Sequence, residues 1–270
     1  MMEAYAFPDF GKTRVDRITK AQIEALHGKI TGDGKPVRAN RVLAVISSVF
    51  GWLNEVDIHT GSNPCAKLER NREEGRETFL EAGEIAAVLG ALEAYEGLTK
   101  GNDVAADCVR FCLATGCRSG EAKAARWDQL DKALTVWTKK ASTTKQRKLH
   151  RGPLGPAATD ILATRKGKAS RGDVYVFPGK YGAEHIQQLR SVWDYVRDQT
   201  GLGEVRVHDM RHSFASLAVS AGVPLKTIGG LLGHSSVTTT NRYAHLYDDD
   251  LRNAAAAVNA RQGPQAGGKK

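Results

Sequence analysis

Apolar residues at helical spacing run through most of this chain, and this feature most strongly limits the fold that it can adopt. Strand-forming residues gather in only two short segments, 134–138 and 174–177, and residues 139–151 are interpreted as a turn and a returning strand. Several helical patterns stop at a glycine, the residue that most easily ends a helix (Gly116, Gly222 and Gly233). We therefore expect a mostly α-helical protein with a small antiparallel β-sheet on one side.

The first unit of the sequence runs to about residue 71. Thr19 and Gln22 stand at capping-box spacing and predict the start of a helix that buries Ile23, Leu26 and Ile30. A second helix carries a longer apolar stripe (Val42, Val45, Ile46, Val49, Phe50 and Leu53). Because both helices are too short to be stable alone, we expect them to pack on each other or on a partner.

A charged stretch at 67–77 is interpreted as the linker to a second unit at 78–262, although an exposed charged helix end remains the alternative. The final residues, 263–270, are expected to form a disordered tail. Helices of the second unit are predicted at 82–92, 104–114, 186–199, 210–220, 224–232, 237–246 and 249–260.

The formal charge of +9 and the pI near 9.4 favour a polyanionic partner, because Lys and Arg release counterions from phosphates. The chain has neither an apolar run near the roughly 20 residues of a membrane span nor a basic start followed by an apolar core, so a cytoplasmic protein is expected. Its cysteines lack zinc spacing, and we expect buried free thiols and no metal site (Cys65, Cys108, Cys112 and Cys117).

Two arginines, two histidines and a tyrosine are candidates for chemistry. Arg118 lies at a break between helical patterns, where free backbone N–H groups favour anions. His208 and Arg211 are three residues apart and share a helical face, and Tyr243 lies nine residues after His234. Guanidinium groups bind nonbridging phosphate oxygens at two points, so this set suits a metal-free attack on a phosphodiester.

Taken singly, each of these residues has an ordinary structural explanation. A lone arginine in a loop is usually a surface charge or ion pair. The histidines would usually be surface or core residues, and a tyrosine on a helix usually packs against its neighbours. Only the combination indicates chemistry.

Three segments resemble the signature boxes of the tyrosine recombinase (phage integrase) family, in the family's order and spacing. They read TGCRSGE at 115–121, HDMRHSFA at 208–215 and LGHSSVTTTNRYAH at 232–245. In addition, KQRKLHRGPL at 145–154 resembles the family's β-hairpin lysine motif, and NRVLAV at 40–45 resembles a helix of its core-binding domain. The resemblance implies the tyrosine recombinase catalytic fold, preceded by a helical core-binding domain.

The resemblance also implies a function, which is to cut and rejoin DNA at specific sites without metal, cofactor or ATP. Tyr243 would attack the scissile phosphate, forming a 3′-phosphotyrosine and releasing a 5′-hydroxyl. Arg118 and Arg211 would hold the nonbridging oxygens, with His234 as a further donor. His208 would hydrogen-bond the phosphate or take the tyrosine proton.

Two further roles follow from the resemblance. Lys145 would protonate the leaving 5′-oxygen, and Glu121 would support the cationic pocket. Without the resemblance, the basic run around Lys145 is interpreted as a solvated hairpin lying on phosphates, and the two interpretations can hold together. The expected DNA-binding residues belong to this hairpin and to the second N-terminal helix (Arg38, Arg41, Lys139, Lys140, Arg147, Lys148 and Arg151).

The chain departs from the family pattern at its start. No separate arm-binding domain precedes Phe7, and the core-binding domain is expected to lack its first helix, as in a fragment or a shortened recombinase. The helix at 251–260 would dock into a neighbouring protomer, which implies a homotetramer on paired double-stranded DNA sites; packing within its own chain stays open. Accessory DNA-bending proteins are further partners that the resemblance suggests.

Other functions remain open at this point. A DNA-binding regulator or remnant without strand transfer would explain the charge, and a type IB topoisomerase would share the pocket chemistry. A metal-dependent nuclease is disfavoured because no cluster of Asp, Glu and His stands out. Tyr247 is a rival nucleophile, but the acidic run at 248–250 would repel DNA, so Tyr243 is preferred.

Overall fold

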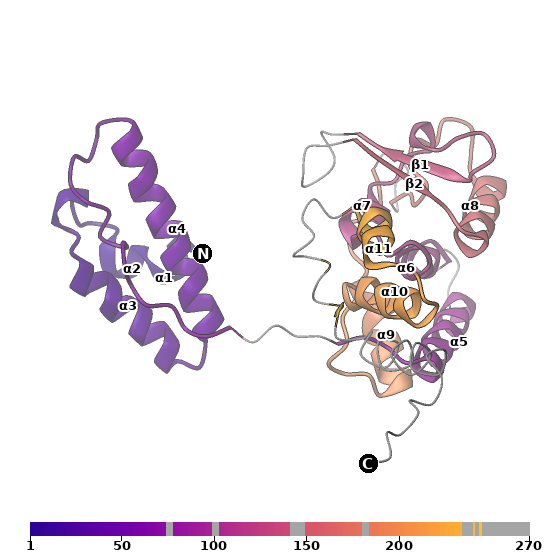
Figure 1. Cartoon of the computed structure of the whole chain (residues 1–270), viewed down its shortest axis with the longest axis horizontal. Coiled ribbons are helices and arrows are strands. Elements are labelled where there is room, and N and C mark those ends of the chain that lie inside the picture. Colours follow the sequence, from indigo (N-terminus) through magenta and orange to yellow (C-terminus); the bar gives the residue numbers. More distant parts are fainter. Residues whose placement is uncertain are drawn as a thin grey trace, which may run out of the picture. The chain divides into compact units, whose positions relative to one another are not determined.

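The computed structural model describes residues 1–73, 78–98, 103–140, 149–179, 184–233, 240, 243 and 244. The chain divides into two compact units, Met1–Arg76 and Glu77–Lys270 (Figure 1). The division falls at the end of the charged stretch interpreted as a linker, of which residues 74–77 lie outside the described part.

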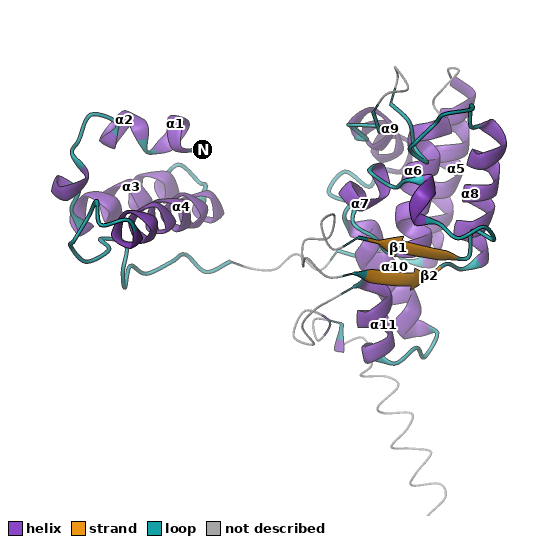
Figure 2. Ribbon diagram, turned by 90° about the horizontal axis from the view of Figure 1, so that it is seen from above, coloured by secondary structure: helices purple, strands orange, loops and turns teal. Residues whose placement is uncertain are grey.

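The N-terminal unit is helical, and its two long helices lie side by side (Figure 2). Thr19 caps the first of them through the predicted capping box with Gln22. Pro36 opens the second, at a position where its missing N–H costs nothing. The elements are α1 (Met2–Tyr5), α2 (Phe7–Phe10), the 3₁₀ turn η1 (Val15–Arg17), α3 (Lys20–Gly32) and α4 (Pro36–Glu55).

The core of this unit forms between α3 and α4. The predicted face of α3 is buried, and it packs with α4 residues spaced by four positions (Val42, Ile46 and Phe50). Val45 is half-buried and Val49 is 41% exposed, while the unpredicted Leu43 is buried, so the packed stripe of α4 is rotated from the predicted one. Val45 and Val49 lie on a neighbouring face of the helix that points away from α3.

A buried asparagine links the last segment of the N-terminal unit to its two long helices. Asn40, in α4, is 3% exposed; its Oδ1 accepts the backbone N–H of Asn71 at 2.9 Å and lies 3.0 Å from His27 Nε2. Its Nδ2 donates to Asn71 O and to Glu73, both at 2.8 Å. The segment after the last helix is thereby fastened to α3 and α4.

In the second unit, α6 (Asp103–Thr115) is the central helix, and it packs against α5 (Ala82–Leu98), α8 (Pro156–Lys168) and α10 (Asp209–Ser220) (Figure 1). The other helices in the described part of this unit are α7 (Ser119–Lys123), η2 (Trp127–Gln129), α9 (Arg190–Thr200) and α11 (Leu225–Leu232). The largest fully buried side chains of this core include Phe111, Phe177, Leu92, Leu162 and Met210.

The sheet is a two-stranded antiparallel pair, β1 (Val136–Lys139) and β2 (His150–Pro153), so the predicted returning strand is confirmed (Figure 2). Its register pairs Val136 with Pro153 and Lys139 with His150. The strand predicted at 174–177 is wrong, since the described residues there make only an isolated bridge between Arg126 and Tyr175. Val176 and Phe177 are buried in the helical core, whereas Val174 is 42% exposed, and the backbone of the segment bonds to residues 125 and 127 outside any named strand.

The helix predictions differ from the structure at several elements. The short helices α1, α2 and α7 were not predicted, and α5 runs to Leu98, beyond its predicted end at residue 92. Helix α8 was missed, although Pro156 stands in its first turn and is a start signal. Helix α9 begins at Arg190, later than predicted, because residues 184–189 pass along the core without helical hydrogen bonds. The helices predicted at 237–246 and 249–260 and the tail at 263–270 lie outside the described residues, apart from 240, 243 and 244.

The three glycines predicted to end helices all have left-handed backbone, with φ of +61° at Gly116, +72° at Gly222 and +67° at Gly233. Along the described ranges, no helix combines the length and the apolar character that a membrane span requires. All four cysteines are buried free thiols, as expected.

Candidate active site

Arg118 lies at the start of α7, directly after the left-handed turn at Gly116 that ends α6. Its side chain is 29% exposed, and Nη1 donates to Glu121 Oε1 at 2.8 Å. Since the carboxylate holds one nitrogen of the guanidinium fork, the side chain is oriented before any ligand arrives.

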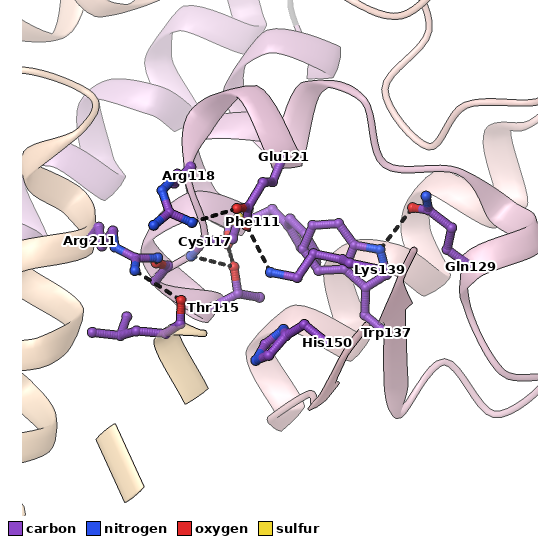
Figure 3. Close-up of polar contacts among 12 residues, drawn as sticks. Phe111, Thr115, Cys117, Arg118, Glu121, Gln129, Trp137, Lys139, His150 and Arg211 are labelled. Atoms are coloured by element: carbon purple, nitrogen blue, oxygen red, sulfur yellow. Dashed lines mark hydrogen bonds and ion pairs between the residues drawn. The ribbon is translucent and has the colours of Figure 1, made fainter. Parts of the chain in front are cut away.

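Glu121 bridges two cations. Its Oε1 accepts from Arg118, and its Oε2 accepts from Lys139 Nζ at 2.8 Å, as Figure 3 shows. Burial acts to raise the pKa of the Glu121 carboxyl, but Lys139 and Arg118 outweigh it, so the pKa lies below its ordinary value. The carboxylate is therefore ionised at neutral pH.

Arg211 joins the turn before Arg118 to the end of α11. It is 3% exposed, and it donates to the backbone carbonyls of Gly116 at 2.8 Å and Leu232 at 2.9 Å. Burial lowers the pKa of Arg211, and the nearby charge of Arg118 lowers it further. Two guanidinium groups are thus brought close together (Figure 3), which is unfavourable unless an anion lies between them.

A cavity of about 420 Å³ opens beside these groups. Arg118, Glu121, Lys139 and His208 line it, with Ser119, Gly120, Ala124, Gln129 and Trp137 completing the wall. His208 immediately precedes α10, the helix that carries Arg211, and is exposed. The cavity therefore combines two cations, Arg118 and Lys139, with a mixed lining of polar and apolar groups.

Tyr243 is buried, 5% exposed, and packs with Ala215, Ile228 and Leu232. Its phenol oxygen lies 2.8 Å from His212 Nδ1. Tyr243 packs against Leu232, whose carbonyl accepts from Arg211, and its partner His212 directly follows Arg211 in α10. The structure thus brings Arg118, Arg211 and Tyr243 to one region of the second unit.

His234, Lys145, Arg147 and Lys148 lie outside the described residues, and so does the rival nucleophile Tyr247.

Among the expected DNA-binding residues, Arg38, Arg41, Lys140 and Arg151 are exposed, as phosphate contacts require. Arg41 pairs with Glu73 at 2.8 Å. Lys139 differs from the prediction, because its side chain is only 7% exposed and is paired with Glu121. The basic run predicted a solvated hairpin, whereas strand alternation turns Lys139 inward.

Sequence reasoning missed the partner of the tyrosine. His212 is 8% exposed and lies in α10, one turn after His208, with the two rings 5.6 Å apart. The i, i+4 spacing of the two histidines was the available signal. In α11, a Cβ at Gly229 would lie 2.8 Å from Thr240 Oγ1, so the glycine lets residue 240 pack closely.

The site's chemistry is that of a preorganised anion-binding pocket beside a phenol. Within the described ranges, no group of three His, Cys, Asp or Glu residues is close enough to hold a metal ion. The four cysteines lie in apolar surroundings, and burial raises the pKa of Cys65 to about 11.

Comparison with known proteins gives two matches that together extend over most of the chain. Residues 78–250 match the Phage integrase family, and residues 1–71 match the Phage integrase central domain. The integrase of Escherichia phage P2 is 29% identical over 252 residues, which cover 93% of this chain and 68% of that protein. Tyrosine recombinase XerD of Bifidobacterium longum is 32% identical over 159 residues, covering 53% of this chain and 50% of that protein. The chain thus spans between half and about two-thirds of the length of these relatives.

Solved structures share the fold. A lambda integrase dimer bound to a COC′ core site gives a TM-score of 0.69 at 17% identity, covering 89% of this chain and 84% of that one. XerH recombinase in a post-cleavage complex with a palindromic difH substrate gives 0.71 at 18% identity, covering 94% and 79%. With the matched segments and the site geometry together, the chain belongs to the phage integrase family of tyrosine recombinases.

Proposed function

We propose that this chain is a site-specific DNA recombinase that cuts and rejoins DNA through a 3′-phosphotyrosine at Tyr243, without metal or ATP. One observation carries the proposal. Arg211 donates to the carbonyl of Gly116, two residues before Arg118, and to the carbonyl of Leu232, against which Tyr243 packs. A phosphodiester anion would relieve the repulsion between the guanidinium groups, and its phosphorus would then face the phenol.

Arg211 supports this role through its backbone contacts. Its two hydrogen bonds to the carbonyls of Gly116 and Leu232 use Nη1 and Nη2, and they fix the plane of the guanidinium. Fixed donors stabilise the charge that grows on the nonbridging oxygens at little reorganisation cost. Arg118 would supply the second clamp, oriented by Glu121.

The tyrosine must lose its proton when it attacks. An unperturbed phenol titrates near pH 10, so a nearby acceptor or cation is needed at neutral pH. His212 Nδ1, 2.8 Å from the phenol oxygen, offers an acceptor, and the edge contact between His212 and His208 leads toward the cavity. From the family resemblance alone, we propose Lys145 as the acid for the leaving 5′-oxygen and His234 as a hydrogen-bond donor to the phosphate.

The partner would be double-stranded DNA. Solved lambda integrase structures include a dimer on a core site and a tetramer on a Holliday junction. By that likeness, we propose that this chain assembles as a tetramer on paired sites, with Arg38 and Arg41 contacting phosphates from the N-terminal unit. Accessory DNA-bending proteins remain part of the proposal.

A nicked suicide DNA substrate tests the function. In EDTA, the wild-type chain should form a covalent DNA adduct that Tyr243→Phe does not form, while Tyr247→Phe still forms it. Peptide mapping should locate the nucleotide on Tyr243. An adduct that persists in Tyr243→Phe would refute the assignment, and cleavage that requires Mg²⁺ would indicate a nuclease. Relaxation of plasmids carrying a single site, without pairing of sites, would favour a topoisomerase.

A further inference from the structure

Lys139, the last residue of β1, has surroundings that the proposed reaction does not explain. Its Nζ is 2.8 Å from Glu121 Oε2 and 4.7 Å from the centre of the Trp137 ring. The ring itself is fixed, because its Nε1 donates to Gln129 at 3.0 Å and it packs on Phe111 at 5.4 Å. The ammonium is therefore held between a carboxylate and an aromatic face.

Stability alone is a weak reason for this pair. Lys139 is 7% exposed and Glu121 10%, and removing two charges from water usually costs as much as their attraction returns. An apolar side chain at position 139 could pack on Trp137 without that cost. The effect of the pair is better sought in the third group that shares the carboxylate, Arg118.

The two oxygens of Glu121 are divided between the two cations. Oε1 takes one N–H of Arg118, while Oε2 takes Lys139. A carboxylate left alone with an arginine tends to bind the guanidinium fork with both oxygens. Without Lys139, Glu121 would therefore also accept a hydrogen bond from a second nitrogen of Arg118. That edge of the guanidinium would then be unavailable to other anions.

The charges in the pocket also favour a role for Lys139 in controlling Arg118. Lys139 and Arg118 line the same cavity, and Arg211 is close to Arg118. Among the residues that the structure describes here, these three cations share one carboxylate, Glu121, so this part of the pocket has a net positive charge. Removing Lys139 would reduce the positive charge available to bind a phosphate. It would also strengthen the interaction between Glu121 and Arg118.

We propose that Lys139 is a positioning residue for strand cleavage, which occupies one oxygen of Glu121 and so keeps Arg118 directed at the scissile phosphate. The inference rests on the proposed function, because it deepens the role of the same pocket. It also assigns Lys139 a different place from the exposed phosphate contact that the sequence predicts.

The first test is single-turnover cleavage of the suicide substrate by Lys139→Met. We expect the rate constant to fall about 10- to 100-fold, whereas DNA affinity, which depends on many phosphate contacts, changes less than about two-fold. Lys139→Arg keeps a cation on Trp137 and should retain most of the rate. The double variant Glu121→Gln/Lys139→Met should cleave faster than Lys139→Met, because no carboxylate remains to hold Arg118. A double variant no faster than Lys139→Met would overturn the proposal.

A sulfur-substituted substrate separates positioning from proton donation. When sulfur replaces the bridging 5′-oxygen, the leaving group needs no acid. If Lys139 positions Arg118, the deficit of Lys139→Met stays the same on this substrate. Full rescue would make Lys139 the general acid and would contradict the inference.

A readout without catalysis keeps the two proposals distinguishable. Titration with inorganic phosphate, followed through the side-chain ¹⁵N signals of arginine, should show affinity about 10-fold weaker in Lys139→Met. Equal phosphate affinity in a variant that unfolds cooperatively like the wild type would refute the role of Lys139. If phosphate binding weakens but the wild type forms no DNA adduct, the proposed function fails and the role of Lys139 stands.

Discussion

Replacing Gly116 with alanine tests how the turn before Arg118 is built. Gly116 has a φ of +61°, where an L-residue costs about 1–2 kcal/mol. A Cβ there would lie 2.5 Å from Phe214 Cδ1 and 2.6 Å from Leu232 Cδ2, and such crowding of a packed core costs about 1–3 kcal/mol more. Gly116→Ala should therefore lose about 2–5 kcal/mol of unfolding free energy.

The matched control is Gly222→Ala, in the same unit. Gly222 has a φ of +72°, but a Cβ there meets nothing within 4 Å, so only the backbone cost of about 1–2 kcal/mol applies. Urea unfolding of both variants, followed by circular dichroism, measures the difference, which is the crowding cost by itself.

Activity should separate the two variants further. Arg211 donates to the carbonyls of Gly116 and Leu232, and the new Cβ would displace both segments. We expect Gly116→Ala to lose cleavage under conditions where it is fully folded, whereas Gly222→Ala keeps it. Equal losses of stability in the two variants, within about 0.5 kcal/mol, would refute the crowding argument.

Three further predictions follow from single contacts. Asn40→Ala removes a buried hydrogen-bonding hub and should lower the unfolding free energy of the full chain by about 2–4 kcal/mol in urea titrations, whereas exposed Asn54→Ala should cost less than about 1 kcal/mol. His212→Phe removes the acceptor at the phenol of Tyr243 and should slow single-turnover cleavage about 100-fold without changing DNA affinity; a rate within three-fold of wild type would exclude His212 from proton removal. The folded pKa of Glu121 is lowered, so its contribution to stability is complete above its ordinary value of 4.5 and is lost as the pH falls through the lower folded value. The stability difference between wild type and Glu121→Gln should therefore shrink below about pH 4.5 in urea titrations at stepped pH, and a constant difference down to pH 3 would contradict the bridging carboxylate.

Local patterns predicted the elements that depend on local chemistry. The capping box at Thr19 and the glycine stops at Gly116 and Gly233 act through neighbouring backbone groups, so a short stretch of sequence is enough to find them. The strand at 174–177 failed for the opposite reason. Val176 and Phe177 pack into the helical core, and composition cannot distinguish that use from strand pairing.

The sequence by itself determined which residue types the site contains, because the spacing of Arg118, Arg211 and Tyr243 within their segments carries the family pattern. Only the tertiary structure decided what each side chain touches. Arg211 binds the carbonyl of Gly116, which is 95 positions away in the chain, and Lys139 turns inward to Glu121. Such contacts depend on how helices and strands pack around one core, and no local periodicity encodes the distance between segments that meet only after folding.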